Sequence, residues 1–115
     1  MLRKLYVPAS LKPNGDGFSF RLRNTLATAT LTSPPEIHLD GVAIPVAHVS
    51  ATLAGVTHPA TAVSVTAPIA LAKGTELEIH VHGRPLPPGA HKIAIKTESK
   101  EWETIAFDVD DKVPG

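Results

Sequence analysis

The sequence predicts an all-β protein, an antiparallel two-sheet β-sandwich of immunoglobulin-like shape. Short stretches in which apolar and polar residues alternate recur at intervals of roughly 8 to 12 residues, as the strands of a sandwich do. No stretch keeps a helical period of apolar residues over about ten residues, and the 11 prolines disfavour long helices. We expect a single domain over residues 1–110 and a short mobile tail over residues 111–115.

Alternation marks the expected strands of the first half. After an Asn14–Gly17 turn, apolar and polar residues alternate from Phe18 to Arg23, as in a strand with one buried face. A second turn at Asp40-Gly41 joins two short strands in a hairpin. The expected strands of this half cover residues 2–7, 18–23, 36–40, 42–45, 49–53 and 63–65.

The second half shows the same pattern with more contrast. From Thr75 to Gly83 the residues Leu, Ile and Val alternate with Glu and His, which gives the strand one buried apolar face and one solvent-exposed polar face. The segment Arg84–Gly89 breaks this strand, because proline donates no backbone hydrogen bond and glycine permits a turn. A charged turn at residues 98–101 then separates two further strands. The expected strands of this half cover residues 75–83, 90–97 and 102–110.

Composition excludes several classes of function. Eleven basic and eleven acidic residues balance to a formal charge of zero, which argues against a nucleic-acid or anionic-lipid surface. The chain has no cysteine, so a disulfide scaffold and thiol chemistry are excluded. No run of about 18 apolar residues is present, and no apolar signal segment follows Arg3 and Lys4. We therefore expect a cytoplasmic protein that binds neither nucleic acid nor membrane.

The longest uncharged stretch runs from Gly41 to Ala72 and contains no Lys, Arg, Asp or Glu. A small domain normally carries charge on strand faces that meet water, so this stretch predicts a surface that meets another protein. Neutral Thr- and Ala-rich strands of a monomeric domain are the alternative explanation. On the expected strands Ser50, Thr52 and Ser64 point away from the core, and we predict that they lie in the partner interface.

Histidines are the candidates for a chemical site. His80 and His82 share the wet face of one strand at a spacing that lets two imidazoles bind one metal, and His91 begins the next strand. A small cupin-like metal enzyme that uses these three residues is therefore one alternative. The residues after the pair, Gly83 to Pro88, supply none of the remaining ligands, which favours an ordinary solvated strand face. No serine lies in a nucleophile motif, so we assign no catalytic residue.

Four segments share their turns and strand ends with a known family. They are residues 17–24, residues 37–41, the Leu-Pro-Pro-Gly-Ala-His-Lys-Ile sequence of residues 86–93, and residues 107–109. Through them the chain resembles the small β subunits of bacterial C-glycoside deglycosidases. The resemblance implies a hetero-oligomer with a larger α subunit, whose xylose-isomerase-like barrel carries a divalent metal, typically manganese, and the catalytic base. Such a pair cleaves the carbon–carbon bond between a 3-oxo-glucoside and a flavonoid or other aromatic aglycone.

These observations lead us to expect an accessory β subunit of a carbon–carbon lyase, with no cofactor of its own. Its role would be to pack against the barrel and support the active-site loops there. A second alternative is a free-standing carbohydrate-binding module in which Trp102 stacks on a sugar, although the chain has few aromatic residues for such a platform.

Overall fold

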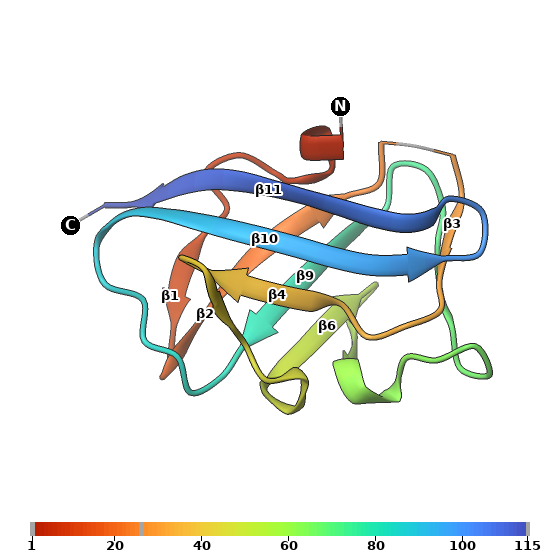
Figure 1. Cartoon of the computed structure of the whole chain (residues 1–115), viewed down its shortest axis with the longest axis horizontal. Helices are drawn as coiled ribbons and strands as arrows, with labels where there is room; N and C mark the ends of the chain where they lie inside the picture. The colour runs from red at the N-terminus through yellow and green to blue at the C-terminus, as the bar shows by residue number, and fades with distance from the viewer. Residues whose placement is uncertain (1, 26, 115) are drawn as a thin grey trace.

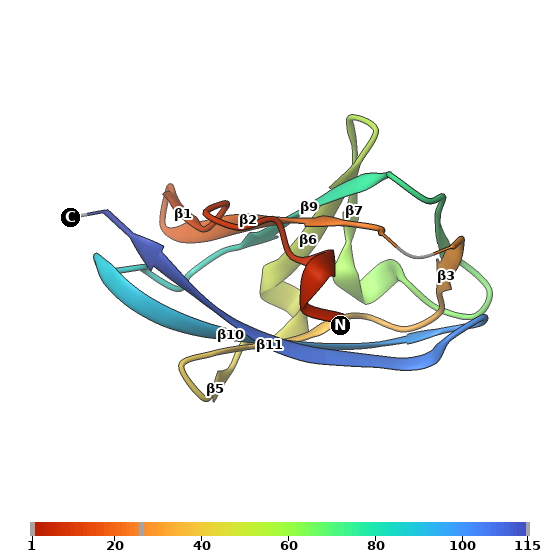
Figure 2. The same ribbon diagram turned by 90° about the horizontal axis from the view of Figure 1, so that it is seen from above.

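The computed structural model describes residues 2–25 and 27–114, with side chains from residue 4 onward. These residues form two β-sheets packed face to face, and every strand pair is antiparallel. The two layers are seen from the front in Figure 1 and from above in Figure 2. The predicted all-β, antiparallel two-sheet sandwich is thereby confirmed.

The first sheet has five strands, and sequence neighbours are not always neighbours in it. Its order is β1-β2-β9-β6-β7, so β2 pairs with a strand from the second half of the chain. The strands are β1 (Lys12–Asn14), β2 (Gly17–Arg23), β9 (Glu76–Val81), β6 (Val49–Leu53) and β7 (Val56–Pro59).

The second sheet is built on β10, which pairs along its whole length with the equally long β11. On its other side β10 pairs with β4 and, at its end, with β3. The strands are β5 (Val42–Ala43), β4 (Glu36–Leu39), β10 (Gly89–Ser99), β3 (Ala29–Leu31), β8 (Ile69–Leu71) and β11 (Glu103–Val113). Three short 3-10 helices complete the described elements: η1 (Leu2–Leu5), η2 (Val46–His48) and η3 (Ala60–Ala62).

The core lies between the sheets, where the alternating apolar residues of both layers meet. Phe18 and Phe20 of β2 are fully buried and stack with ring centroids 6.4 Å apart. Burial of one such side chain contributes about 1.5–3 kcal/mol to folding. At Gly17 the two strands β2 and β9 leave no room for a side chain, because a Cβ atom there would lie 1.7 Å from the Val81 carbonyl oxygen.

Three expectations from the sequence are wrong. The strand expected over residues 2–7 is mostly the η1 helix, and only Tyr6 bridges to Leu22. Residues 63–65 form no strand, because Ser64 and Ala67 exchange backbone hydrogen bonds in a turn that leaves Val65 78% exposed. The tail expected from residue 111 begins later, since β11 pairs with β10 as far as Val113, which is buried.

The described part of the chain contains no helix long and apolar enough to cross a membrane. The cytoplasmic location expected from the sequence stays a prediction.

Candidate functional site

The predicted interface residues fall in two places. Ser50 and Thr52 lie on the outer face of β6, because the residues that alternate with them, Val49 and Ala51, are buried in the core. Thr52 also contacts Thr57 of β7 through its hydroxyl, at 2.9 Å. Ser64 is not on this face. Its hydroxyl accepts a hydrogen bond from the Ala67 N–H (3.2 Å) and so stabilises the turn that follows η3.

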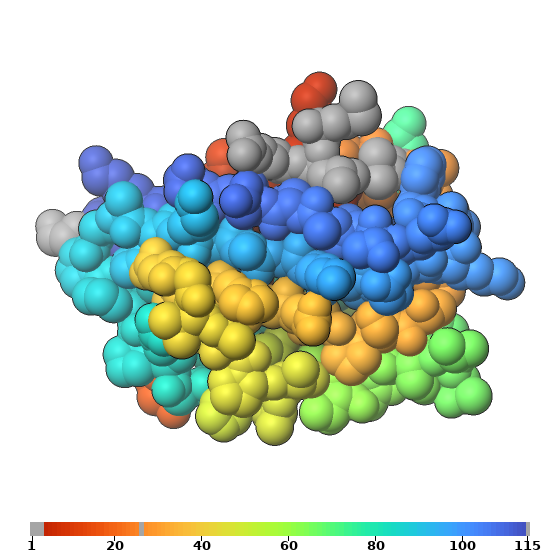
Figure 3. All heavy atoms as spheres, in the orientation of Figure 1, coloured from red at the N-terminus to blue at the C-terminus, as the bar shows by residue number. Residues whose placement is uncertain are grey.

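The uncharged stretch forms one side of the sandwich. Residues 42–62, which we call the charge-free side, fold as β5, η2, β6, β7 and η3. Figure 3 shows the yellow and green atoms of this stretch along one long side of the molecule. Both sheets end there, the second at β5 and the first at β7. Val42 in β5 and Val56 in β7 are 51% and 56% exposed, at hairpins that project from opposite faces of the sandwich in Figure 2.

The three histidines of the predicted alternative metal site do not come together. His80 lies on the outer face of the first sheet, where its Nε2 is 2.9 Å from Glu78 Oε1 and its Nδ1 is 3.3 Å from Asn14 Nδ2. His82 follows the strand and is exposed. His91 is buried on the inner face of the other sheet. No cluster of three His, Cys, Asp or Glu residues within the described ranges could hold a metal ion. The cupin-like alternative therefore has no support.

His91 instead holds two loops together, a role that the sequence analysis missed. Its Nδ1 is 2.7 Å from Asp40 Oδ2 and its Nε2 is 2.7 Å from the Pro87 carbonyl oxygen. These two hydrogen bonds raise the pKa of His91 above its ordinary value, although burial opposes them. The contact with His91, together with the hydrogen bond from the Lys92 N–H, lowers the pKa of Asp40.

A second polar contact joins the N-terminal segment to β11. The Tyr6 hydroxyl donates to Asp111 Oδ2, which also accepts the Leu11 N–H at 3.2 Å. Burial of the ring and then the contact with the carboxylate raise the pKa of Tyr6. Because Asp111 is engaged in this way, it belongs to the folded sandwich and not to a tail.

Trp102 is fixed in the turn between β10 and β11. Its Nε1–H donates to the Thr28 carbonyl oxygen at 3.3 Å, and the neighbouring Glu101 accepts hydrogen bonds from the N–H and hydroxyl of Thr30. These hydrogen bonds lower the pKa of Glu101. Trp102 is 43% exposed, whereas the rings of Phe18 and Phe20 are buried. Within the described residues no second exposed ring accompanies Trp102, so the carbohydrate-binding alternative has no support.

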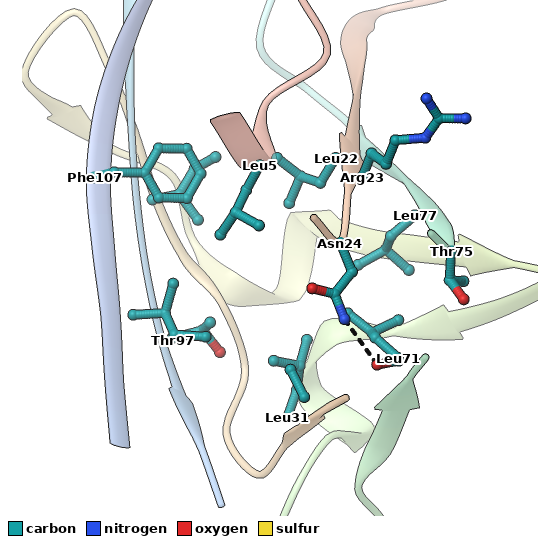
Figure 4. A pocket seen from close by; sticks show the side chains of 13 residues that line it. Leu5, Leu22, Arg23, Asn24, Leu31, Leu71, Thr75, Leu77, Thr97 and Phe107 are labelled. Carbon is teal, nitrogen blue, oxygen red and sulfur yellow. Dashed lines mark hydrogen bonds between the residues drawn. The ribbon is translucent and has the colours of Figure 1, made fainter. Parts of the chain in front are cut away.

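One cavity opens between the sheets beside η1, and Figure 4 shows the side chains around it. Asn24 is one of the lining residues and donates through Nδ2 to the Leu71 carbonyl oxygen at 2.8 Å. The cavity volume is about 60 Å³, far below the roughly 300–1,000 Å³ of sites that enclose a small-molecule ligand. The cavity is therefore a gap in core packing and not a substrate site. Its walls are mainly apolar: Leu5, Leu22, Ala29, Leu31, Leu71, Leu77, Ile95, Ile105 and Phe107.

A comparison with protein families identifies the relationship of this sandwich to known proteins. Residues 1–114 match the family described as hydroxymethylglutaryl-CoA reductase, N-terminal domain. The chain belongs to this family. No curated protein matches the sequence.

Membership of the reductase N-terminal domain family overturns the expected identity. The chain is not a β subunit of a C-glycoside deglycosidase, and the lyase role and the xylose-isomerase-like partner are wrong with it. The structure shows why the resemblance misled us. Residues 37–41 run into the β4–β5 turn, and residues 86–93 are a proline-rich loop entering β10; sandwiches of unrelated families use such turns. Neither the family match nor the structure tests whether a partner would carry the expected manganese.

Proposed function

We propose that this chain is a non-catalytic domain of a hydroxymethylglutaryl-CoA reductase, and that it packs through its charge-free side against the catalytic part of that enzyme. The observation that carries the proposal is the position of the uncharged stretch. It runs along the edge of the sandwich where both sheets end, the second at β5 and the first at β7. Exclusion of charge from the centre of a contact is typical of protein interfaces.

The engagement of the buried polar side chains supports the non-catalytic part of the proposal. His91 joins two loops, Asn24 binds the Leu71 carbonyl, and Tyr6 binds Asp111. Each of these contacts fastens one segment of the chain to another. Ser19 is buried without a hydrogen-bond partner, but its side chain has no exposed surface through which a substrate could reach it. These groups stabilise the sandwich.

The geometry of the edge indicates how the partner would bind. An unprotected edge strand commonly recruits a strand from another chain. Here the edge strand β7 is short and ends in Pro59, which has no N–H to donate. Packing of side chains is therefore favoured over strand addition. A stable contact buries about 800 Å² on each partner, a modest part of the 6274 Å² that the chain exposes.

Charge substitutions on this side test the proposal. We expect Ser50→Glu and Thr52→Lys to weaken binding to the catalytic part of the reductase by at least about tenfold, because each substitution brings a larger, charged side chain into the contact. Ser64→Glu tests the separate turn and should have a smaller effect. Thermal unfolding should change little, since exposed substitutions usually alter stability by about 0.5 kcal/mol or less.

Ala106→Lys is a matched control, because Ala106 is exposed on β11 of the other sheet, outside the charge-free side. Titration calorimetry of the two purified proteins gives the affinities. Wild-type binding by both β6 variants, or equal weakening by Ala106→Lys, would show that the domain contacts the enzyme elsewhere.

A further inference from the structure

The surroundings of His91 require a particular protonation state. A carbonyl oxygen can only accept a hydrogen bond, and so can an ionised carboxylate. His91 places one ring nitrogen 2.7 Å from each kind of acceptor. Only the ring that carries protons on both nitrogens satisfies both contacts. A neutral ring has a single N–H and directs a lone pair at one of the two oxygens.

The two acceptors belong to segments that are distant in the sequence. Asp40 lies in the β4–β5 turn with a φ of 52°, and Pro87 lies in the loop of residues 82–88 that joins β9 to β10. This loop contains three prolines, so its backbone has few N–H groups with which to hold itself in place. Leu86 anchors the loop through its buried side chain. The contact of Pro87 with His91 is a second anchor.

The segments that pack around the His91 ring carry other charged groups. Arg84, in the same loop, disfavours the protonated ring through its own positive charge. Asp111 lies opposite His91 on β11, but its carboxylate already accepts the Tyr6 hydroxyl and the Leu11 N–H. The Lys92 N–H donates to the other oxygen of Asp40, Oδ1. Asp40 is therefore the acidic group whose charge favours protonation of His91.

We propose that His91 is a proton-controlled latch between the β4–β5 turn and the 82–88 loop. The protonated ring donates one hydrogen bond to each segment. When the ring loses a proton to solvent, the remaining N–H stays on the Asp40 carboxylate, because a hydrogen bond to a charged acceptor is the stronger one. The Pro87 carbonyl then faces a lone pair and moves away. Leu86 remains buried, so the loop opens locally while the sandwich stays folded. This inference does not depend on the proposed function.

NMR titration of the whole chain between pH 5 and 9 tests the latch. We expect the amide signals of Gly83, Arg84 and Leu86 to shift with the same midpoint as the His91 ring, above the ordinary value of 6.5. In Asp40→Asn this midpoint should fall by about one unit or more, since the negative charge that favours the imidazolium is lost. Asn tolerates the positive φ at this position, so the backbone turn is preserved.

His91→Gln should abolish the loop transition, whereas the matched control His82→Gln should retain it, because His82 is an exposed histidine in the same loop. A loop transition that disappears in His82→Gln would overturn the proposal, as would an unchanged midpoint in Asp40→Asn. If His91→Gln does not fold, the ring and loop midpoints of the wild type and of Asp40→Asn still decide the outcome.

Discussion

Individual polar residues in this sandwich hold together segments that the hydrophobic core does not fix. His91 joins two loops, and Tyr6 joins the N-terminal segment to β11. Alternation along residues 91–97 already puts His91 at an inward position, and a buried polar group needs a partner. The sequence could thus have predicted that His91 is hydrogen-bonded. It could not name Asp40 or Pro87, because the pairing depends on two loops meeting in space.

The stability of the domain should depend on pH through this pair of residues. The pKa of His91 is raised, so its contribution is fully present below 6.5 and is lost as pH rises through the folded-state pKa. The pKa of Asp40 is lowered, so its contribution is present above 3.8 and is lost as pH falls through the folded-state pKa. Urea unfolding should therefore show greatest stability from this pair between pH 4 and 6.5.

His91→Gln provides the check on that pH profile. It should remove the fall in the free energy of unfolding above neutral pH and leave the stability of the variant nearly flat there. A variant that loses stability between pH 7 and 9 as steeply as the wild type would contradict the assignment to His91.

Elements of secondary structure differ in how well their own residues specify them. The strands β2, β9 and β10 follow from strict alternation over six or more residues. The short strands β1, β3, β7 and β8 were missed, because so short a stretch has no measurable period. The end of β11 was missed for another reason. Its inward position 111 holds an aspartate, which the distant Tyr6 satisfies.

The approach of β2 to β9 gives a sharp prediction for Gly17. Gly17→Ala would place a Cβ atom 1.7 Å from the Val81 carbonyl oxygen, so the two strands would have to separate. We expect a loss of at least about 3 kcal/mol in the free energy of unfolding, which is large for a single substitution.

Gly15→Ala is the matched control for that substitution. Gly15 lies in the turn before β2, has no atom within 4 Å of an added Cβ, and has a φ of 61°. It should lose only about 1–2 kcal/mol through the strained turn. Equal losses in the two variants, measured by urea unfolding, would mean that the strand contact at Gly17 is not critical.

At the scale of the whole molecule, the fold class could be predicted from the sequence and the family could not. The two sheets follow from alternation and turns, which many sandwiches share. The deglycosidase resemblance rested on such turns and was wrong. The uncharged stretch was visible in the sequence, but its gathering on one side depends on how β5 and β7 end the two sheets. Ser64 was placed on a strand, whereas it lies in the turn that follows η3.

The isolated domain should bind no stoichiometric transition metal. His80 already contacts Glu78 and Asn14, and His91 lies on the other sheet. Fewer than three ligands therefore converge, which is too few for a stable zinc site. Elemental analysis of the purified chain should find well below one metal ion per molecule. One tightly held ion that is lost in a His80→Ala, His82→Ala double variant would refute this expectation.

The pairing of β2 with β9 also has a consequence for synthesis of the protein. Phe18 lies opposite Val81, so β2 cannot find its partner until the ribosome has made most of the chain. Until then β2 has only the short β1 beside it, and an isolated hairpin is barely stable in water. Phe18 and Phe20 stay exposed to the cell during that interval. Topologies dominated by such distant pairings fold slowly, on the order of milliseconds to seconds. A nascent chain of this domain therefore leaves two large aromatic rings unburied for longer than a chain whose strands pair in sequence order.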